Sequence, residues 1–369
     1  MWALLLSLLT ALVFGLPLVP AVLEWQRRRD IRPLAIDSEH TLDVAAVAAE
    51  FRAMIVTQTE PMRHGGATHS IRGVNAGANV TGIWLPTAAE AASRVCKRTV
   101  VASGSLILPD NYTFTHDIYG PRGIRTGKEN HLQSLLSEGE LLMRSGSEMH
   151  RWAHARSAHI EAHCHLLGPL SATYTIRIDE GCHFAYLNAG VIGFGMHHLA
   201  ESGAQRSACP RDGGAWTEAV PAHVKAAGEG RWLATRDLTI SPRSLFQGDL
   251  VVHGDLWIGA GARIAGSVKA SGSIRLGAEV RIDGSLIAGG SIALAKSCMI
   301  AGPVSAEREL DIETLSVIGS AEKPTTVVAP VVRVSVGAVV YGAACAQEEG
   351  RVVSNGQYRL TVAHSSHMR

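Results

Sequence analysis

The 369-residue chain has few charged and few aromatic side chains. Charged residues make up 18% and aromatic residues 5%, whereas roughly 25% of residues are charged in a typical soluble protein. The net charge of +1 gives no indication of the overall basic character of many nucleic-acid-binding proteins, so no nucleic-acid partner is expected. The six cysteines are scattered and form no Cys-x-x-Cys pair. Such spacing is typical of reduced thiols rather than of a secreted disulfide scaffold.

The chain also lacks a recognisable catalytic motif. No Ser-His-Asp set and no pair of carboxylates is legible, and the glycine-rich "GFGMHH" near Gly193 matches no phosphate-binding loop. The segment "HIEAH", His159 to His163, lacks the glutamate position of the zinc motif H-E-x-x-H. We therefore expect a non-enzymatic protein with no catalytic residues, no cofactor and no cofactor- or metal-binding residues.

One long uncharged run stands at the N-terminus. Residues 1–23 contain no charged side chain, and roughly 20 apolar residues suffice to span a bilayer. Arg27, Arg28 and Arg29 follow, and such a basic cluster stays on the cytoplasmic side. The pattern predicts a single-pass anchor in a bacterial inner membrane, with the main body cytoplasmic. The alternative is a cleaved signal peptide with a processing site at Val19 to Ala21, although a basic n-region is missing.

The C-terminal half repeats every eighteen residues. "IAGSVKASGSIRLGAEVR", from Ile264, is followed by "IDGSLIAGGSIALAKSCM", from Ile282. Within each repeat, pairs of apolar or small residues recur every six positions, which excludes a single helical face. A triplet with apolar first and third residues is a minimal strand with alternate side chains inward. The glycines between triplets suit sharp turns. The repeat predicts a parallel β-helix with three short strands per turn. Two sets of aligned positions are Phe246, Ile264, Ile282, Ile300 and Ile318, and Gly248, Gly266, Gly284 and Gly302.

Two kinds of protein share this turn length. Left-handed hexapeptide acyltransferases require a small residue where this chain has bulky ones, such as Val268, Ile274 and Leu286, so a right-handed coil is expected. The segment "GDLVVHGDLWIGAGARIAGSVKASGSIRLGAEVRIDGSLIAGG" resembles the bactofilin family of bacterial polymer-forming cytoskeletal proteins, over about 110 residues. The resemblance implies a β-helix that assembles end to end without nucleotide, often at the membrane, and acts as a scaffold for envelope-building enzymes. An acyltransferase-like enzyme and an exported binding solenoid are the alternatives.

Two Cys-His pairs, Cys164-His165 and Cys182-His183, are also separated by eighteen residues. The period of six recurs around them and predicts a second, less regular solenoid over 99–200, stacked on the first. In this register both cysteines face inward and both histidines face outward, one turn apart. Cysteine and histidine of one pair cannot then share a metal. The alternative is a surface metal on His165 and His183, with His163 as a further candidate ligand.

These observations divide the chain into six parts. We expect a transmembrane anchor (1–23), a juxtamembrane region with a helix from Thr41 (24–98), the irregular solenoid (99–200) and a linker loop (201–230). The bactofilin-like β-helix (231–343) and a C-terminal hairpin or tail (344–369), with Asn355-Gly356 as its turn, complete the chain. The expected partners are further copies of the chain, through the β-helix ends, together with the inner membrane and cell-envelope synthesis enzymes.

Overall fold

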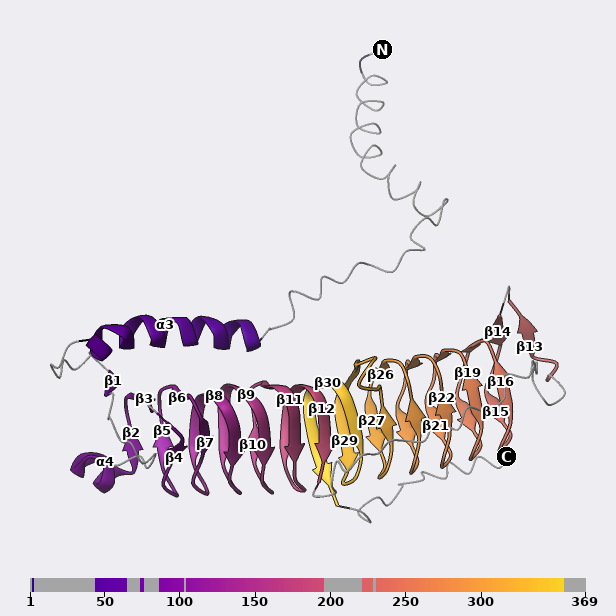
Figure 1. Ribbon diagram of the computed structural model, residues 1–369. Helices are drawn as coiled ribbons and strands as arrows, with labels where there is room; N and C mark the ends of the chain where they lie inside the picture. The colour runs from indigo at the N-terminus through magenta and orange to yellow at the C-terminus, as the bar shows by residue number, and fades with distance from the viewer. Residues whose placement is uncertain are drawn as a thin grey trace. The chain divides into compact units, whose positions relative to one another are not determined.

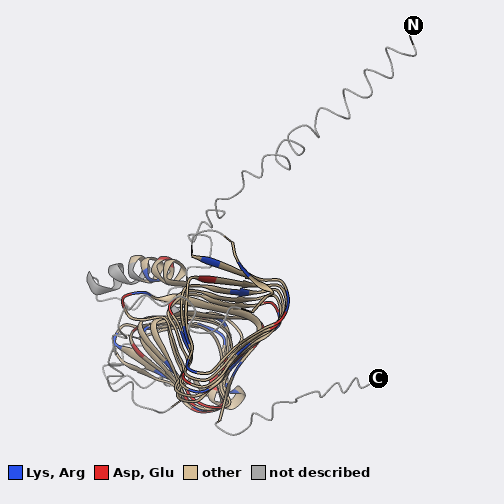
Figure 2. Cartoon of the chain, turned by 90° about the vertical axis from the view of Figure 1, so that its right-hand side faces the viewer, with Lys and Arg blue, Asp and Glu red and all other residues tan. Residues whose placement is uncertain are grey.

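The computed structural model describes Trp2 and residues 44–64, 74–75, 86–195 except 103, and 221–354 except 228–229. Its body is a β-solenoid of about 13 turns, with roughly 18 residues per turn. Figures 1 and 2 show the stacked turns from the side and along the solenoid. The structure is mostly β, and the predicted β-helix with turns of about eighteen residues is confirmed. The right-handed sense of the coil stays a prediction.

The N-terminal solenoid contains one short helix and twelve strands within the described residues. Its turns are uneven: Ile124 lies in register with Leu106, eighteen residues earlier, and with Leu141, seventeen residues later. These two turns together span 35 residues. The elements are β1 (Val74–Asn75), α4 (Ala88–Ser93), β2 (Val95–Cys96), β3 (Thr99–Val101), β4 (Leu106–Ile107), β5 (Thr113–Phe114), β6 (Ile118–Gly120), β7 (Gly123–Arg125), β8 (His131–Met143), β9 (Glu148–Ile160), β10 (His165–Leu166), β11 (Leu170–Ile178) and β12 (His183–Phe194).

The C-terminal solenoid is more regular. Phe246, Ile264, Ile282, Ile300 and Ile318 pair in sequence through successive strands, and each is at most 1% exposed. The next step, from Ile318 to Val340, contains the extra residues around "SAEKPTT". The elements are β13 (Val224–Ala226), β14 (Arg231–Ala234), β15 (Leu238–Ile240), β16 (Leu245–Gln247), β17 (Asp249–Val252), β18 (Leu256–Ile258), β19 (Arg263–Ala265), β20 (Val268–Ala270), β21 (Ile274–Leu276), β22 (Arg281–Ile282), β23 (Leu286–Ala288), β24 (Ile292–Leu294), β25 (Met299–Ile300), β26 (Val304–Ala306), β27 (Glu309–Ile312), β28 (Val317–Ile318), β29 (Thr325–Ser335) and β30 (Val339–Val353).

The two solenoids meet through the last strand of each. β12 pairs antiparallel with β30, with Leu187 opposite Ala344 and Ile192 opposite Val340. In Figure 1 the N-terminal solenoid winds from one end and the C-terminal solenoid from the other, so that both finish at this junction. Their buried side chains form one continuous core. The predicted stacking of the two segments therefore exists, and it joins them tail to tail.

The glycines at the turns allow close approach of backbone to backbone. Gly248 has a φ of +109°, and a Cβ on Gly266 would lie 2.1 Å from the Gly248 carbonyl oxygen. No side chain fits in that space without moving the backbone of the preceding turn. This explains why glycine recurs at this position of the eighteen-residue repeat.

Helix α3 (Val44–His64) covers one side of the N-terminal solenoid. Its buried side chains, Val44, Ala48, Phe51 and Ile55, pack on Tyr119, Leu136 and Trp152. The rings of Phe51 and Trp152 meet edge to face at 5.8 Å, and the Arg52 guanidinium lies 2.7 Å from the Glu138 carboxylate. The helix expected in region 24–98 is present and is a lateral cover of the solenoid. Its expected N-cap, Thr41, lies outside the described residues.

Some predicted features fall outside the described part. They include the uncharged run 1–23, apart from Trp2, and the arginine cluster 27–29. Most of the linker 201–230 and the Asn355-Gly356 turn also lie outside the described residues. β30 continues past the expected boundary at residue 343, as far as Val353. None of the helices in the described residues has the length and apolar character required to cross a membrane.

Candidate functional site

The cysteines occupy a structural column at one corner of the coil. Cys164 and Cys182 are both fully buried, as predicted, and each thiol donates a hydrogen bond to a carbonyl of the preceding turn: Arg144 at 3.2 Å and Glu161 at 3.1 Å. The Ser147 hydroxyl, one turn earlier, makes the equivalent bond to Gly127 at 3.1 Å. Small side chains that donate a hydrogen bond are therefore interchangeable at this corner.

The corner of the C-terminal solenoid uses the same bond. The Cys298 thiol donates to the Gly277 carbonyl at 3.3 Å, and the Ser316 hydroxyl donates to the Ala295 carbonyl at 3.1 Å. Burial raises the pKa of Cys298 to about 11, so the thiol stays protonated and can donate. A thiol with a raised pKa is a poor nucleophile. These cysteines hold adjacent turns together.

The histidines of the two Cys-His pairs face outward, as predicted. His165 pairs in register with His183, and their rings stack with centroids 4.8 Å apart and planes 10° from parallel. Partial burial lowers the pKa of His183, electrostatic interactions with His165 and Arg351 lower it further, and Glu349 raises it. The ligand atoms of His163, His165 and His183 do not form a metal-sized group of three in the described structure. In the described residues, these three histidines therefore do not place three ligand atoms close enough to share one metal ion.

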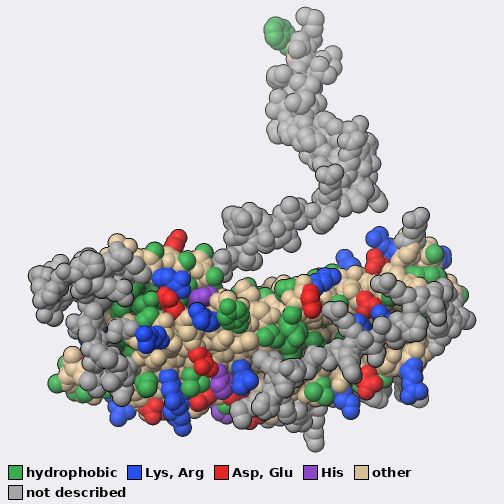
Figure 3. All heavy atoms as spheres, in the orientation of Figure 1, with side chains coloured by type: hydrophobic (Ala, Val, Ile, Leu, Met, Phe, Trp, Pro, Cys, Tyr) green, Lys and Arg blue, Asp and Glu red, His purple; other side chains and the backbone are tan. Residues whose placement is uncertain are grey.

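Outward side chains continue this stack in both directions. A straight column runs through paired positions on successive strands: His131, Glu148, His165, His183 and Arg351. The last pair crosses the antiparallel junction between β12 and β30. The column is therefore a polar surface that continues from one solenoid to the other. Elsewhere, on the face seen in Figure 3, charges of both signs are interspersed.

The N-terminal end of the first solenoid carries helix α4. Thr87 and Glu90 form a capping box, and the Arg98 guanidinium makes two hydrogen bonds to the Glu90 carboxylate, at 2.7 and 2.8 Å. Burial raises the pKa of Glu90, but the bonds from Arg98 and Thr87 outweigh it and bring the pKa to about 2. α4 lies beside β2, and β1 pairs with β3. These elements cover part of the terminal turn.

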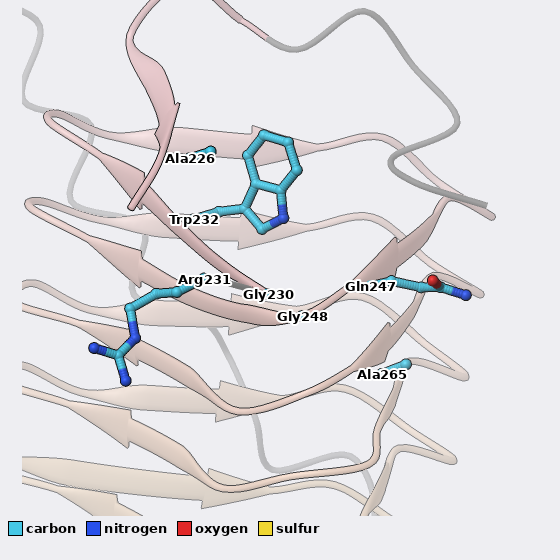
Figure 4. Close-up of a pocket in the computed structure, with 7 residues that line it drawn as sticks. All are labelled: Ala226, Gly230, Arg231, Trp232, Gln247, Gly248 and Ala265. Carbon is cyan, nitrogen blue, oxygen red and sulfur yellow. The ribbon is translucent and has the colours of Figure 1, made fainter. Parts of the chain in front are cut away.

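The opposite end of the solenoid is more open. β13 pairs with β14, but within the described residues β15 and β16 each pair with a strand on one side only. Trp232 points inward from β14, where its ring meets Phe246 edge to face at 6.1 Å and closes the end of the core. A cavity of about 560 Å³ lies here, lined in part by Trp232, Arg231 and Gln247, whose arrangement Figure 4 shows. We call this region, from β13 to β16, the Trp232 end.

The Trp232 end was not singled out by sequence reasoning. Trp232 stands eighteen residues before Leu250 and pairs with it, so the repeat does place it inward. Its large aromatic side chain in the first turn of the regular repeat is the sequence signal that could have marked this end. Neither family models, nor curated proteins, nor solved structures gave a match to this chain.

Proposed function

We propose that this protein is a non-enzymatic, bactofilin-like scaffold with a right-handed coil, which self-associates through the Trp232 end. The observation that carries the proposal concerns strands β15 and β16: among the residues that the structure describes, each pairs with a neighbouring strand on one side only. Unpaired strand edges recruit further strands. Trp232 and the adjacent cavity add apolar surface to this edge.

The tail-to-tail junction limits how far such an assembly extends. Because β12 and β30 already pair with each other, the last turn of the C-terminal solenoid is not available as a second contact, and α4 and β1 cover part of the other free end of the body. Two copies that meet through their Trp232 ends make a two-fold contact, which closes on itself. We therefore propose that the protein forms a dimer or a short assembly.

The proposed cellular setting follows from the uncharged run 1–23 and Arg27 to Arg29. We place the chain in a bacterial inner membrane with its body in the cytoplasm, as a platform for cell-envelope synthesis enzymes. An alkaline phosphatase fused after residue 369 should then be inactive, because the enzyme requires the oxidising periplasm to form its disulfides. An active fusion would refute the cytoplasmic placement.

The self-association is tested by sedimentation of residues 30–369. We expect concentration-dependent dimers for the wild type and monomers for Trp232→Arg, which places a charge in the contact. Trp257→Arg is the matched control, because Trp257 is 54% exposed on the side of the solenoid. Since Trp232 also plugs the core, Thr239→Pro is a second variant. It removes an edge N–H from β15, and proline is tolerated on edge strands.

The result is read against folding measured by circular dichroism. Loss of the dimer in Trp232→Arg and Thr239→Pro, with the Trp257→Arg dimer intact, supports the proposal. A wild-type protein that stays monomeric at high concentration overturns it, as does a dimer that only Trp257→Arg disrupts.

A further inference from the structure

Three ligating side chains converge on the outward face of β8 and β9. His131 Nδ1 lies 3.0 Å from one carboxylate oxygen of Glu148, and His150 Nε2 lies 3.6 Å from the same oxygen. The rings of His131 and His150 face each other with centroids 6.4 Å apart. One ligand atom from each residue lies within 4.8 Å of the others. The three groups therefore point at a common volume.

The backbone holds these positions in place. His131 and Glu148 pair directly across the β8–β9 ladder, and His150 follows Glu148 by two residues on the same side of the strand. Alternate residues of a strand share one face, and neighbouring strands lie about 4.8 Å apart. Only side-chain rotations are then needed to bring the three ligand atoms to equal distances from one point.

We propose that His131, Glu148 and His150 bind one divalent transition-metal ion of the zinc class. Zinc bonds to histidine nitrogen and carboxylate oxygen are about 2.0–2.2 Å long, which puts tetrahedral ligand atoms roughly 3.4 Å apart. The two separations from the Glu148 oxygen, 3.0 Å to His131 and 3.6 Å to His150, bracket that value, and the two histidine nitrogens lie within 4.8 Å of each other. Imidazole and carboxylate together suit zinc, nickel, cobalt and copper better than calcium or magnesium.

The exposure of the site leaves a coordination position open. The side chains of His131, Glu148 and His150 are 53%, 35% and 36% exposed. A structural zinc site is closed by four protein ligands, whereas three ligands leave room for water or an incoming group. The site thus takes a metal with an exchangeable fourth ligand. It does not depend on the proposed scaffold function, because all three residues lie on the side of the N-terminal solenoid.

The test is a titration of the full-length chain, prepared without a histidine tag and treated with a chelator. Zn²⁺ binding is measured by calorimetry, and Co²⁺ binding by its visible absorption, which reports the coordination number. We expect one tight site, and an affinity reduced at least about ten-fold in Glu148→Gln and in His150→Gln. The double variant His165→Gln/His183→Gln is the matched control, because it removes two neighbouring surface imidazoles and should leave the tight site intact.

Thermal melting in excess chelator checks that each variant folds like the wild type. Absence of a tight site in the wild type overturns the proposal. Equal affinity in the wild type, Glu148→Gln and His150→Gln also overturns it. Loss of binding in the His165→Gln/His183→Gln control alone would move the metal to the stacked histidine pair and exclude the site proposed here.

Discussion

Ile282 and Arg281 are neighbours in β22 whose side chains face opposite sides of the sheet. Ile282 is fully buried, and Arg281 reaches the Asp283 carboxylate at 3.1 Å on the surface. We expect Ile282→Asp to lower the free energy of unfolding by at least about 3 kcal/mol, because it places an unpaired charge in an apolar interior. Arg281→Gln should cost less than about 1 kcal/mol, since it removes only a partly exposed ion pair.

Urea unfolding of both variants measures this difference. The assignment of inward and outward positions predicts that Ile282→Asp unfolds at a much lower urea concentration than Arg281→Gln. Similar losses for Ile282→Asp and Arg281→Gln would contradict the register of β22.

His183 makes the stability of the junction depend on pH. Its pKa in the folded protein lies below the ordinary value of 6.5, chiefly because of burial. The unfolded chain therefore binds the proton more readily, so protonation favours unfolding. The contribution of His183 to stability should be complete above about pH 6.5 and be lost as the pH falls through the lowered pKa.

We expect the melting temperature to fall between pH 7 and pH 5, and to fall less in His183→Gln. His116→Gln is the control, because His116 is exposed and lies away from the β12–β30 junction. If His183→Gln loses as much stability as the wild type over this range, His183 is not a source of the pH dependence.

At the scale of elements, helix α3 is attached to the solenoid by a small cluster of side chains. Phe51 is 9% exposed and meets Trp152, whereas Met54, on the same helix, is 45% exposed. We expect Phe51→Ala to release α3 while the solenoid stays folded, because the strands keep their own separate core. Met54→Ala should have no such effect.

Hydrogen exchange followed by mass spectrometry distinguishes local from global opening. Faster exchange in 44–64 alone, for Phe51→Ala only, is the expected result. Equal exchange in Phe51→Ala and wild type would show that other contacts, such as Arg52 with Glu138, suffice to hold the helix.

The strands of the C-terminal solenoid follow from the sequence more directly than those of the N-terminal solenoid. In the former, successive turns between Phe246 and Ile318 keep the spacing of eighteen. In the latter, Leu141 follows Ile124 by seventeen residues, and the long strands β8 and β9 contain register shifts. Where a turn has one residue fewer, its side chains no longer match a fixed frame of eighteen. His131 therefore pairs with Glu148 and not with residue 149. For this reason the sequence analysis did not predict that His131, Glu148 and His150 lie together.

For the whole molecule, the tail-to-tail junction predicts that an isolated 231–343 segment assembles differently from residues 30–369. In an isolated 231–343 segment, nothing from β12 covers the C-terminal turn, so both ends present unpaired strands. We expect this segment to form filaments or large oligomers, because edges at both ends allow open-ended growth. Residues 30–369 should form at most dimers or short assemblies.

Sedimentation of both proteins at equal concentration and salt, with electron microscopy of the pellets, provides the measurement. Long filaments of 30–369 would contradict the blocking role of the β12–β30 junction. A monomeric 231–343 segment would count against the proposal that this protein is of the polymer-forming class.

The sequence by itself determined which side chains point inward, because burial selects apolar residues at a regular local spacing. Cys164, Cys182 and Ile282 were placed correctly on that basis. Only the tertiary structure decided that β12 meets β30 and that β15 and β16 have one strand partner each in the described part of the chain. Every strand edge offers the same backbone donors and acceptors. No side-chain pattern therefore says which edges will pair, and the choice depends on how the chain returns in space to bring two distant turns together.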